Sequence, residues 1–179
     1  MKKLSRSLIA TAAGAALLGL SACGTGSGSG GGNTEAPETT SSQAGLASFD
    51  PCTFFQPDQL TSFGLGTQSE PFAPVSYEPG CRWTGEKFIL SLQKNAEETV
   101  ASYETTGSWD SYTKKTIAGR SAAVALESGA TGVGSCSVLV DAGGGVAIFM
   151  LDGQRQDSVP DPCGETEKIV SQVASQLPK

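Results

Sequence analysis

The sequence contains no histidine in its 179 residues. Histidine is the commonest general base in enzymes and the commonest metal ligand, so its absence removes two simple routes to a catalytic site. A Ser-His-Asp or Cys-His catalytic arrangement cannot be built from this chain. No two cysteines stand at C-x-x-C spacing, which excludes the usual zinc site. The sequence therefore predicts no metal and no cofactor.

Positive charge is also scarce. The chain has 12 Lys and Arg residues against 18 Asp and Glu residues, which gives a net charge of -6. Three of the basic residues and none of the acidic ones lie in residues 1–22, so the chain without that segment carries -9. A domain this acidic repels phosphate backbones and anionic lipid headgroups. Nucleic acid is therefore excluded as a partner.

A long hydrophobic run is missing as well. The most apolar stretch, Leu8–Leu20, is diluted by Ala and Gly, and a membrane-spanning helix needs about 20 strongly apolar residues. Basic residues precede the stretch and small ones follow it, which predicts a cleavable leader over residues 1–22. The run Leu20-Ser21-Ala22-Cys23 resembles the cleavage box of bacterial lipoprotein signal peptides, whose cysteine receives diacylglycerol. Cys23 is thus the predicted lipidation site; an ordinary secretory leader and an uncut anchor are the alternatives.

Residues 23–45 follow the predicted cut and contain almost nothing that a fold could bury. Their Gly, Ser, Thr and Pro content predicts a flexible tether behind the lipidated cysteine, with a root-mean-square reach of about 25 Å. No strand precedes the glycines and no Lys-Ser or Lys-Thr follows them, so they do not form a phosphate-binding loop. We expect residues 46–179 to form one globular domain, held by lipid at the outer face of the plasma membrane.

The globular part has four cysteines, which are Cys52, Cys81, Cys136 and Cys163. An even number in an exported chain predicts two disulfides, because the compartment is oxidising. Asp50-Pro51-Cys52 and Asp161-Pro162-Cys163 each place a capping Asp, a Pro and a Cys at a helix start. Each of these cysteines has a strand cysteine at a similar distance, 29 and 27 positions away. This favours the pairs Cys52–Cys81 and Cys136–Cys163 over the other two connectivities.

Alternating side chains predict the strands. The clearest alternation covers Phe88–Gln93, Cys136–Asp141 and Val146–Leu151, and weaker strands are expected at 80–84, 115–117 and 122–126. Three glycines in Ala142–Gly145 indicate a hairpin turn between the last two clear strands. Trp83 lies two residues after Cys81, so both side chains should share one face and pack together.

Three helices are expected around these strands. The four-residue spacing of Ile169, Val173 and Leu177 predicts the last one. A second is expected over 97–103, with Asn95 and Glu98 as a capping box, and a short one restarts at Pro57 and ends at Gly64. The sum is a single α+β domain, a mainly antiparallel sheet with helices against one face.

The order of these motifs resembles one family. The leader and its cysteine, the tether, both Asp-Pro-Cys triplets, Gly80-Cys81-Arg82-Trp83 and the segment Ile117–Ala122 are similar to small actinobacterial lipoproteins grouped as domain of unknown function 3558. The resemblance covers essentially the whole chain. It implies an envelope lipoprotein with two disulfides and no assigned reaction, and a layout similar to PsbP-like domains. It supplies no catalytic residue.

Catalytic alternatives are few. Ser111-Tyr112-Thr113-Lys114 satisfies the S-x-x-K pattern, but the companion motifs of penicillin-recognising enzymes are missing. Paired carboxylates for glycoside cleavage would have to come from Glu97, Glu98, Asp110 or Glu127, and a solvated acidic surface explains these residues equally well.

Binding is the function class that remains. The aromatic residues outside the clear strands line either a groove or the core; they are Phe54, Phe55, Phe72, Tyr77 and Trp109. We therefore expect a non-catalytic binding or accessory module of the cell envelope, whose partner is an envelope protein, a lipid or a wall ligand. The alternative is a small envelope hydrolase or transferase that uses carboxylates or Ser111 and Lys114.

Overall fold

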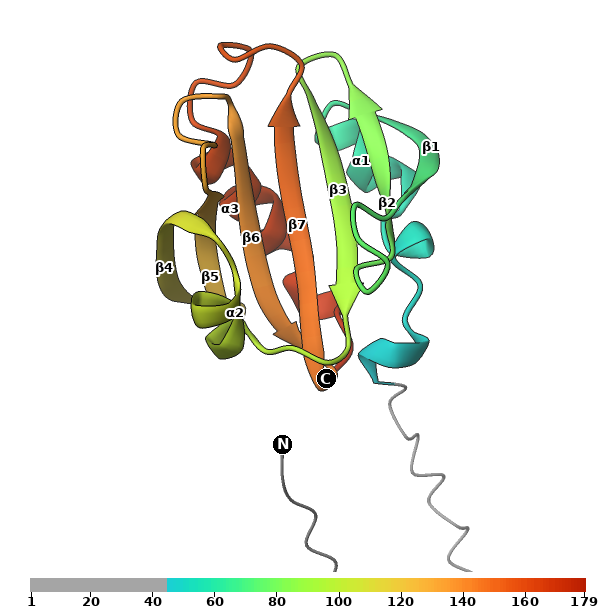
Figure 1. Cartoon of the computed structure of the whole chain (residues 1–179). Helices are drawn as coiled ribbons and strands as arrows, with labels where there is room; N and C mark the ends of the chain where they lie inside the picture. The colour runs from blue at the N-terminus through green and yellow to red at the C-terminus, as the bar shows by residue number, and fades with distance from the viewer. Residues whose placement is uncertain (1–44) are drawn as a thin grey trace, which may run out of the picture. The chain divides into compact units, whose positions relative to one another are not determined.

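The computed structural model of the chain describes residues 45–179 (Figure 1). Seven antiparallel strands form one sheet in the spatial order β1-β2-β3-β7-β6-β5-β4. The strands are β1 (Leu65–Phe72), β2 (Gly80–Gly85), β3 (Phe88–Asn95), β4 (Trp109–Ile117), β5 (Arg120–Glu127), β6 (Ser135–Ala142) and β7 (Gly145–Gly153). Two runs of hairpins, β1 to β3 and β4 to β7, join where β7 pairs with β3. The predicted α+β class is confirmed.

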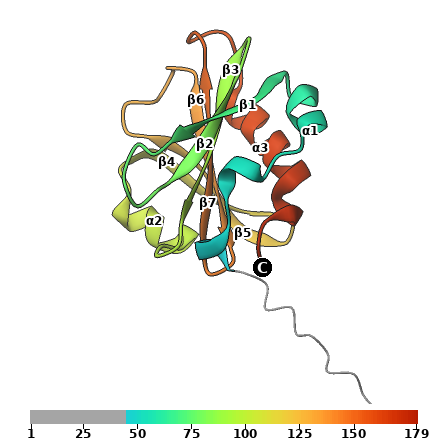
Figure 2. The same ribbon diagram turned by 90° about the vertical axis from the view of Figure 1, so that its right-hand side faces the viewer.

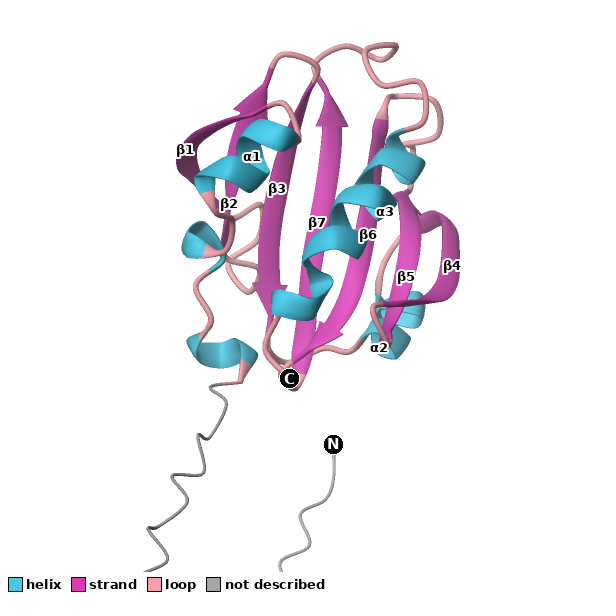
Figure 3. Cartoon of the chain, turned by 180° about the vertical axis from the view of Figure 1, so that it is seen from behind, coloured by secondary structure: helices cyan, strands magenta, loops and turns pink. Residues whose placement is uncertain are grey.

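The helices lie on both faces of the sheet. They are α1 (Pro57–Ser62), α2 (Val100–Thr106) and α3 (Pro162–Val173), with short 3₁₀ turns η1 (Leu46–Ser48), η2 (Pro51–Thr53) and η3 (Ala174–Gln176). Helices α1 and α3 lie in front of the sheet in Figure 3, and Figure 2 shows α2 on the opposite side. The prediction that the helices share one face was wrong for α2. The chain must cross from the central strand β3 to the edge strand β4, and α2 crosses on the face that α3 leaves free.

The start of α2 also differs from the prediction. Strand β3 continues to Asn95, which pairs with Val146, so Asn95 belongs to the sheet. The helix begins at Val100, and Thr99 is its N-cap: the Thr99 hydroxyl accepts from the Ser102 amide, and the Ser102 hydroxyl accepts from the Thr99 amide. A capping box is therefore present, but four residues later than the sequence suggested.

The two glycines at the tip of the β6–β7 hairpin confirm the predicted turn. Ala142 pairs with Gly145, which leaves Gly143 and Gly144 as the connecting residues. Their φ angles are 56° and 87°. A two-residue turn with positive φ at both positions twists in the direction that the strands require, and glycine adopts it without steric cost.

Both Asp-Pro-Cys triplets begin helical turns as predicted. The Asp161 carboxylate accepts a hydrogen bond from the Gly164 amide at 2.9 Å and caps α3. The Asp50 carboxylate accepts from the Cys52 amide at 2.9 Å, but the turn that it starts is only the 3₁₀ turn η2. Helix α3 then buries Ile169, Val170 and Val173 completely against the sheet. The predicted amphipathic pattern of the last helix is thus confirmed.

The larger core lies between the sheet and the face covered by α1 and α3. Its centre is aromatic: the Phe55 ring lies 4.9 Å from those of Phe54 and Trp83 and 6.3 Å from that of Phe149, in edge-to-face arrangements. Trp83 is 2% exposed and shares this cluster with Cys81, as the strand period predicts. Such pairs contribute about 0.5–1.5 kcal/mol each beyond the area that they bury.

Two disulfides fix this core. Cys52 bonds to Cys81 and Cys136 bonds to Cys163, so the favoured connectivity is confirmed. The first bond joins η2 to β2, and the second joins the first turn of α3 to β6. Each therefore ties a helical start to the sheet across the core.

No helix within residues 45–179 combines the length and the apolar character that crossing a membrane requires. The predicted leader, tether and lipidation site lie outside the described residues.

Candidate binding site

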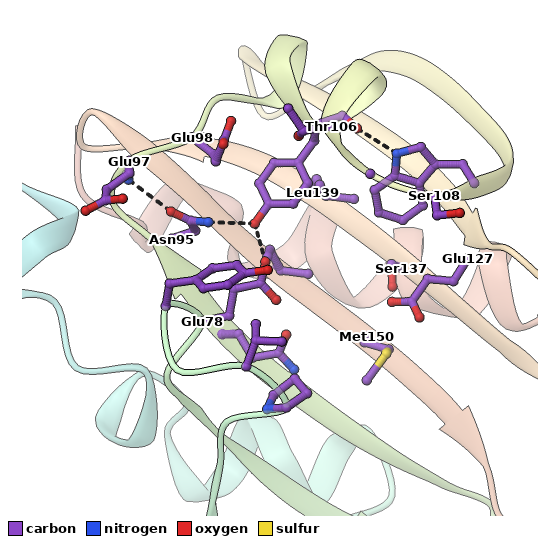
Figure 4. Close-up of a pocket in the computed structure, with 18 of the residues that line it drawn as sticks. Glu78, Asn95, Glu97, Glu98, Thr106, Ser108, Glu127, Ser137, Leu139 and Met150 are labelled. Atoms are coloured by element: carbon purple, nitrogen blue, oxygen red, sulfur yellow. Dashed lines mark hydrogen bonds between the residues drawn. The ribbon is translucent and has the colours of Figure 1, made fainter. Parts of the chain in front are cut away.

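The sheet face that carries α2, called here the open face, is only partly covered. Beside α2 the side chains of this face surround an open depression of about 840 Å³ (Figure 4). Its floor comes from β3, β6 and β7, and its walls come from the β1–β2 loop, α2 and the starts of β4 and the β5–β6 loop. This volume is within the range of small-molecule sites.

Strand alternation places polar residues on the floor. Ser91 and Ser137 both pair with Met150, so these three side chains form one row across the central strands. Gln93 pairs with Ile148 in the next row. Gln93 and Ser137 are each only 3% exposed, although both line the depression. A floor this buried and polar needs hydrogen-bond partners.

Two of these floor groups lack strong partners within residues 45–179. The Gln93 amide nitrogen donates to the Ser91 hydroxyl at 3.3 Å, and the Ser137 hydroxyl has no partner among the described residues. Every side-chain nitrogen or oxygen of this region that is cut off from solvent does have a partner. The Ser137 hydroxyl must therefore touch the solvent that fills the depression.

A hydrogen-bonded cluster centred on Tyr103 builds one wall. The Tyr103 hydroxyl donates to the Glu78 carboxylate and accepts from the Asn95 side-chain amide at 2.9 Å. The Asn95 side-chain oxygen Oδ1 accepts a hydrogen bond from the Glu97 main-chain amide at 3.0 Å. Burial, followed by the bond to Glu78, raises the pKa of Tyr103 far above its usual value, so the hydroxyl stays protonated. The cluster joins the β1–β2 loop to β3 and α2.

The wall beside α2 depends on a close approach at Gly107. The Trp109 indole nitrogen donates to the Tyr103 carbonyl oxygen at 2.6 Å. A Cβ atom on Gly107 would lie 2.3 Å from the indole ring. Tyr112 donates to the Val100 carbonyl oxygen at 2.6 Å, and burial raises the pKa of Tyr112 to about 12. The indole is therefore held in one orientation at the edge of the depression.

All the charged side chains that line the depression are acidic. Four carboxylates line it, those of Glu78, Glu97, Glu98 and Glu127, and no Lys or Arg does. None of the four forms a salt bridge within residues 45–179, whereas five other carboxylates of that region do. Partial burial and repulsion from Asp152 and Glu78 raise the pKa of Glu127. The depression therefore has an uncompensated negative potential.

We expect Glu127→Gln to stabilise the protein slightly at pH 7, by up to about 0.5 kcal/mol. The raised pKa means that the folded state binds the Glu127 proton more tightly than the unfolded chain does. The parent protein therefore loses stability as the pH rises from the pKa of Glu127 in the unfolded chain to its pKa in the folded state. Above the folded-state pKa the full loss of stability is present. The gain should vanish well below pH 4.5, the ordinary value for this group.

Thermal unfolding of the parent protein and of Glu127→Gln, at pH 7 and well below pH 4.5, measures this effect. Glu86→Gln is the matched control, since Glu86 lies in the β2–β3 turn outside the lining of the depression and its substitution removes the same charge. If Glu127→Gln lowers the midpoint at pH 7 relative to that control, Glu127 makes a favourable contact that outweighs its burial and repulsion.

The structure separates Ser111 from Lys114. Along β4, Ser111 pairs with Leu126 and Lys114 pairs with Ala123. Because their separation is odd, the two side chains point to opposite faces of the strand. Lys114 instead forms a salt bridge with Glu104 at 2.6 Å. A serine nucleophile activated by this lysine is therefore not assembled.

The four candidate catalytic carboxylates do not all lie at one site. Glu97, Glu98 and Glu127 line the depression. Asp110 instead accepts hydrogen bonds from the Thr131 hydroxyl at 2.7 Å and from the Gly129 and Thr131 amides, and these bonds lower its pKa. It holds the β5–β6 loop in place.

The five aromatic residues that lie outside the clearly predicted strands also occupy different places in the structure. Phe54 and Phe55 are core residues, and Phe72 lies on the edge strand β1 beneath the Arg82 guanidinium. Tyr77 and Trp109 line the depression. The core interpretation is thus correct for Phe54 and Phe55, and the groove interpretation is correct for Tyr77 and Trp109.

Within residues 45–179 no three Cys, Asp or Glu side chains gather closely enough to hold a metal ion. The four lining carboxylates are therefore spread around the depression.

Fold and site together define a small, disulfide-bonded α+β domain with an open polar depression on one sheet face. The chain belongs to the family described as protein of unknown function (DUF3558), whose model matches residues 18–176. No curated protein and no solved structure matches the chain.

Proposed function

We propose that this protein is a lipoprotein of the cell envelope, anchored through a lipid on Cys23 at the outer face of the plasma membrane, and that it acts there as a non-catalytic binding module. Its partner would be an envelope protein, a lipid or a wall ligand. The depression on the open face is the proposed recognition site.

The family match supports the anchor. It begins at residue 18, so the run Leu20-Ser21-Ala22-Cys23 lies inside the sequence that family members share. The two disulfides agree with an oxidising compartment outside the cytoplasm.

The observation that carries the binding role is the buried polar floor of the depression. Gln93 and Ser137 are almost fully buried, yet they offer hydrogen-bonding capacity to whatever fills the site. In the free protein this capacity is open to the solvent of the depression, and a polar ligand could bind to the same groups. The Ser111–Lys114 form of the hydrolase alternative is not supported, because the two side chains point to opposite faces of β4.

Substitution of Cys23 with serine tests the anchor. We expect the parent protein in the membrane fraction, with a mature mass above that of the chain from Cys23 by the attached acyl groups. Two or more buried acyl chains hold a protein stably to a bilayer, at about 0.8 kcal/mol per methylene. The Cys23→Ser variant has no thiol to accept the lipid, so it should carry no acyl mass and should not be cut before residue 23. Fractionation followed by intact-mass measurement reads out both forms.

Cys136→Ala with Cys163→Ala is the matched control, because it removes cysteines without touching the anchor and should remain membrane-bound. An unmodified Cys23 in the mature parent protein would contradict the proposed anchoring.

A further inference from the structure

We infer that the depression binds a small organic cation, a molecule whose protonated amine lies beside Glu127 and Ser137 while its polar body meets the floor at Gln93. This inference rests on the proposed binding function and names the ligand class of that site. Three independent features of the depression support it.

The first feature is the unbalanced charge. The lining has four carboxylates and no basic side chain, and none of the four has an ion-pair partner within residues 45–179. A ligand with a negative group would be repelled. A protonated amine would supply the missing positive charge and form charge-assisted hydrogen bonds to carboxylate oxygens.

The second feature is the free polar capacity beneath this charge. Ser137 pairs with Ala125 across β5 and β6, and Glu127 follows two residues later on the same face. Figure 4 draws both side chains in the lining of the depression. Ser137 is only 3% exposed, and its hydroxyl has no hydrogen-bond partner among the described residues. Ser137 therefore offers the depression a hydroxyl that no described residue uses, on the strand next to the one that carries Glu127.

The third feature is the spacing of the acids. No three acidic side chains in residues 45–179 approach closely enough to chelate a metal ion. Negative charge dispersed around about 840 Å³ suits an extended organic cation better than a compact metal ion. Tyr77 and Trp109 on the walls add aromatic surface, which attracts organic ammonium groups and not hydrated metal ions.

The fixed walls add preorganisation. The Tyr103 cluster holds Glu78 through a hydrogen bond, and the Tyr103 carbonyl oxygen holds Trp109. Two of the groups that would face a ligand are therefore already positioned, so binding need not order them.

Ligand-observed saturation-transfer NMR on the full-length mature protein in uncharged detergent tests the inference. The probes are glucosamine and tyramine, each compared with its neutral N-acetyl form and its anionic N-succinyl form. These sets keep the sugar or the phenol body. Acetylation removes the positive charge of the amine, succinylation replaces it with a negative carboxylate, and both add an acyl group. We expect saturable binding of the free amines in the millimolar range or better, and binding at least about tenfold weaker for both acylated forms.

Three variants locate the bound amine. Glu127→Gln should weaken amine binding about tenfold, and Ser137→Ala about threefold. Glu86→Gln, which loses the same charge outside the lining of the depression, should leave amine binding unchanged. Near-ultraviolet circular dichroism of each variant checks that the fold is retained, so that a lost affinity is not lost structure.

The outcomes separate the two proposals. Stronger binding of the N-acetyl or N-succinyl forms, sensitive to Ser137→Ala, would overturn the cation inference and leave the depression as a binding site. Equal effects of Glu127→Gln and Glu86→Gln would show attraction to net charge alone and would also overturn it. If none of the six probes binds, both the cation inference and the assignment of the depression as recognition site fall, while the Cys23 anchor is judged by its own test.

Discussion

Replacing Cys136 and Cys163 together with alanine is expected to lower the free energy of unfolding by about 3.5 kcal/mol. The bond spans 27 positions, and the loop contains most of β6, all of β7 and the connection to α3. Opening it gives the unfolded chain more freedom. The folded state should survive, because Ile169, Val170 and Val173 remain fully buried against the sheet and hold α3 without the bond.

Urea unfolding of the oxidised protein measures this loss. The midpoint should fall and the dependence on urea should steepen, since the unlinked unfolded chain is more expanded. The pair Cys52→Ala with Cys81→Ala is the control, because its loop spans 29 positions and the chain-entropy model gives nearly the same loss. Losses that differ by several kcal/mol would mean that local packing at one bond, and not loop closure, sets its contribution.

The central strands could be predicted because each carries an alternating pattern that the sheet uses directly. Leu90 and Leu92 and their β7 partners Leu151 and Phe149 fill one core, so their period is visible in the sequence. The disulfide pairs were also predictable. Both Asp-Pro-Cys triplets start a helical turn near a strand cysteine, and the fold keeps that local arrangement twice.

The edge strands could not be predicted in the same way. Only Leu65 of β1 is buried, and only Ile117 of β4. An edge strand is held by main-chain pairing on one side, and its side chains are free to be polar. Pro71 is acceptable in β1 for the same reason, although proline argues against a central strand. Strand β1 was therefore missed, and β4 was predicted only at its end.

The depression could not be predicted from the sequence, for a related reason. Gln93 and Ser137 stand at polar positions of alternating strands, which a sequence pattern assigns to solvent. Both lie on strands inside the sheet, where the crossing of α2 and the β1–β2 loop encloses the second face. Only the spatial order of the strands reveals that burial. Tyr103 and Glu78 were missed because they are 25 positions apart and meet only through the fold.

Trp83→Ala is expected to lower the free energy of unfolding by about 3–5 kcal/mol, the usual cost of removing a large buried aromatic side chain. Trp83 is 2% exposed and lies on β2, where it pairs with Leu90. Its ring meets that of Phe55 edge-on, and Phe55 in turn meets Phe149. The lost indole would leave a cavity between the sheet and the segment that the Cys52–Cys81 bond holds. That bond limits how far the neighbouring chain can collapse into the space.

Trp109→Ala provides the control with the same change of side chain. Trp109 lies at the wall of the depression and is only partly buried, so its removal extends an open space and does not create a closed cavity. We expect a loss less than half that of Trp83→Ala, mainly from the hydrogen bond to the Tyr103 carbonyl oxygen. Far-ultraviolet circular dichroism during urea unfolding gives one signal for both variants, since each keeps a different tryptophan. Equal losses of unfolding free energy would contradict this expectation. They would mean that the wall of the depression contributes as much to stability as the aromatic core does.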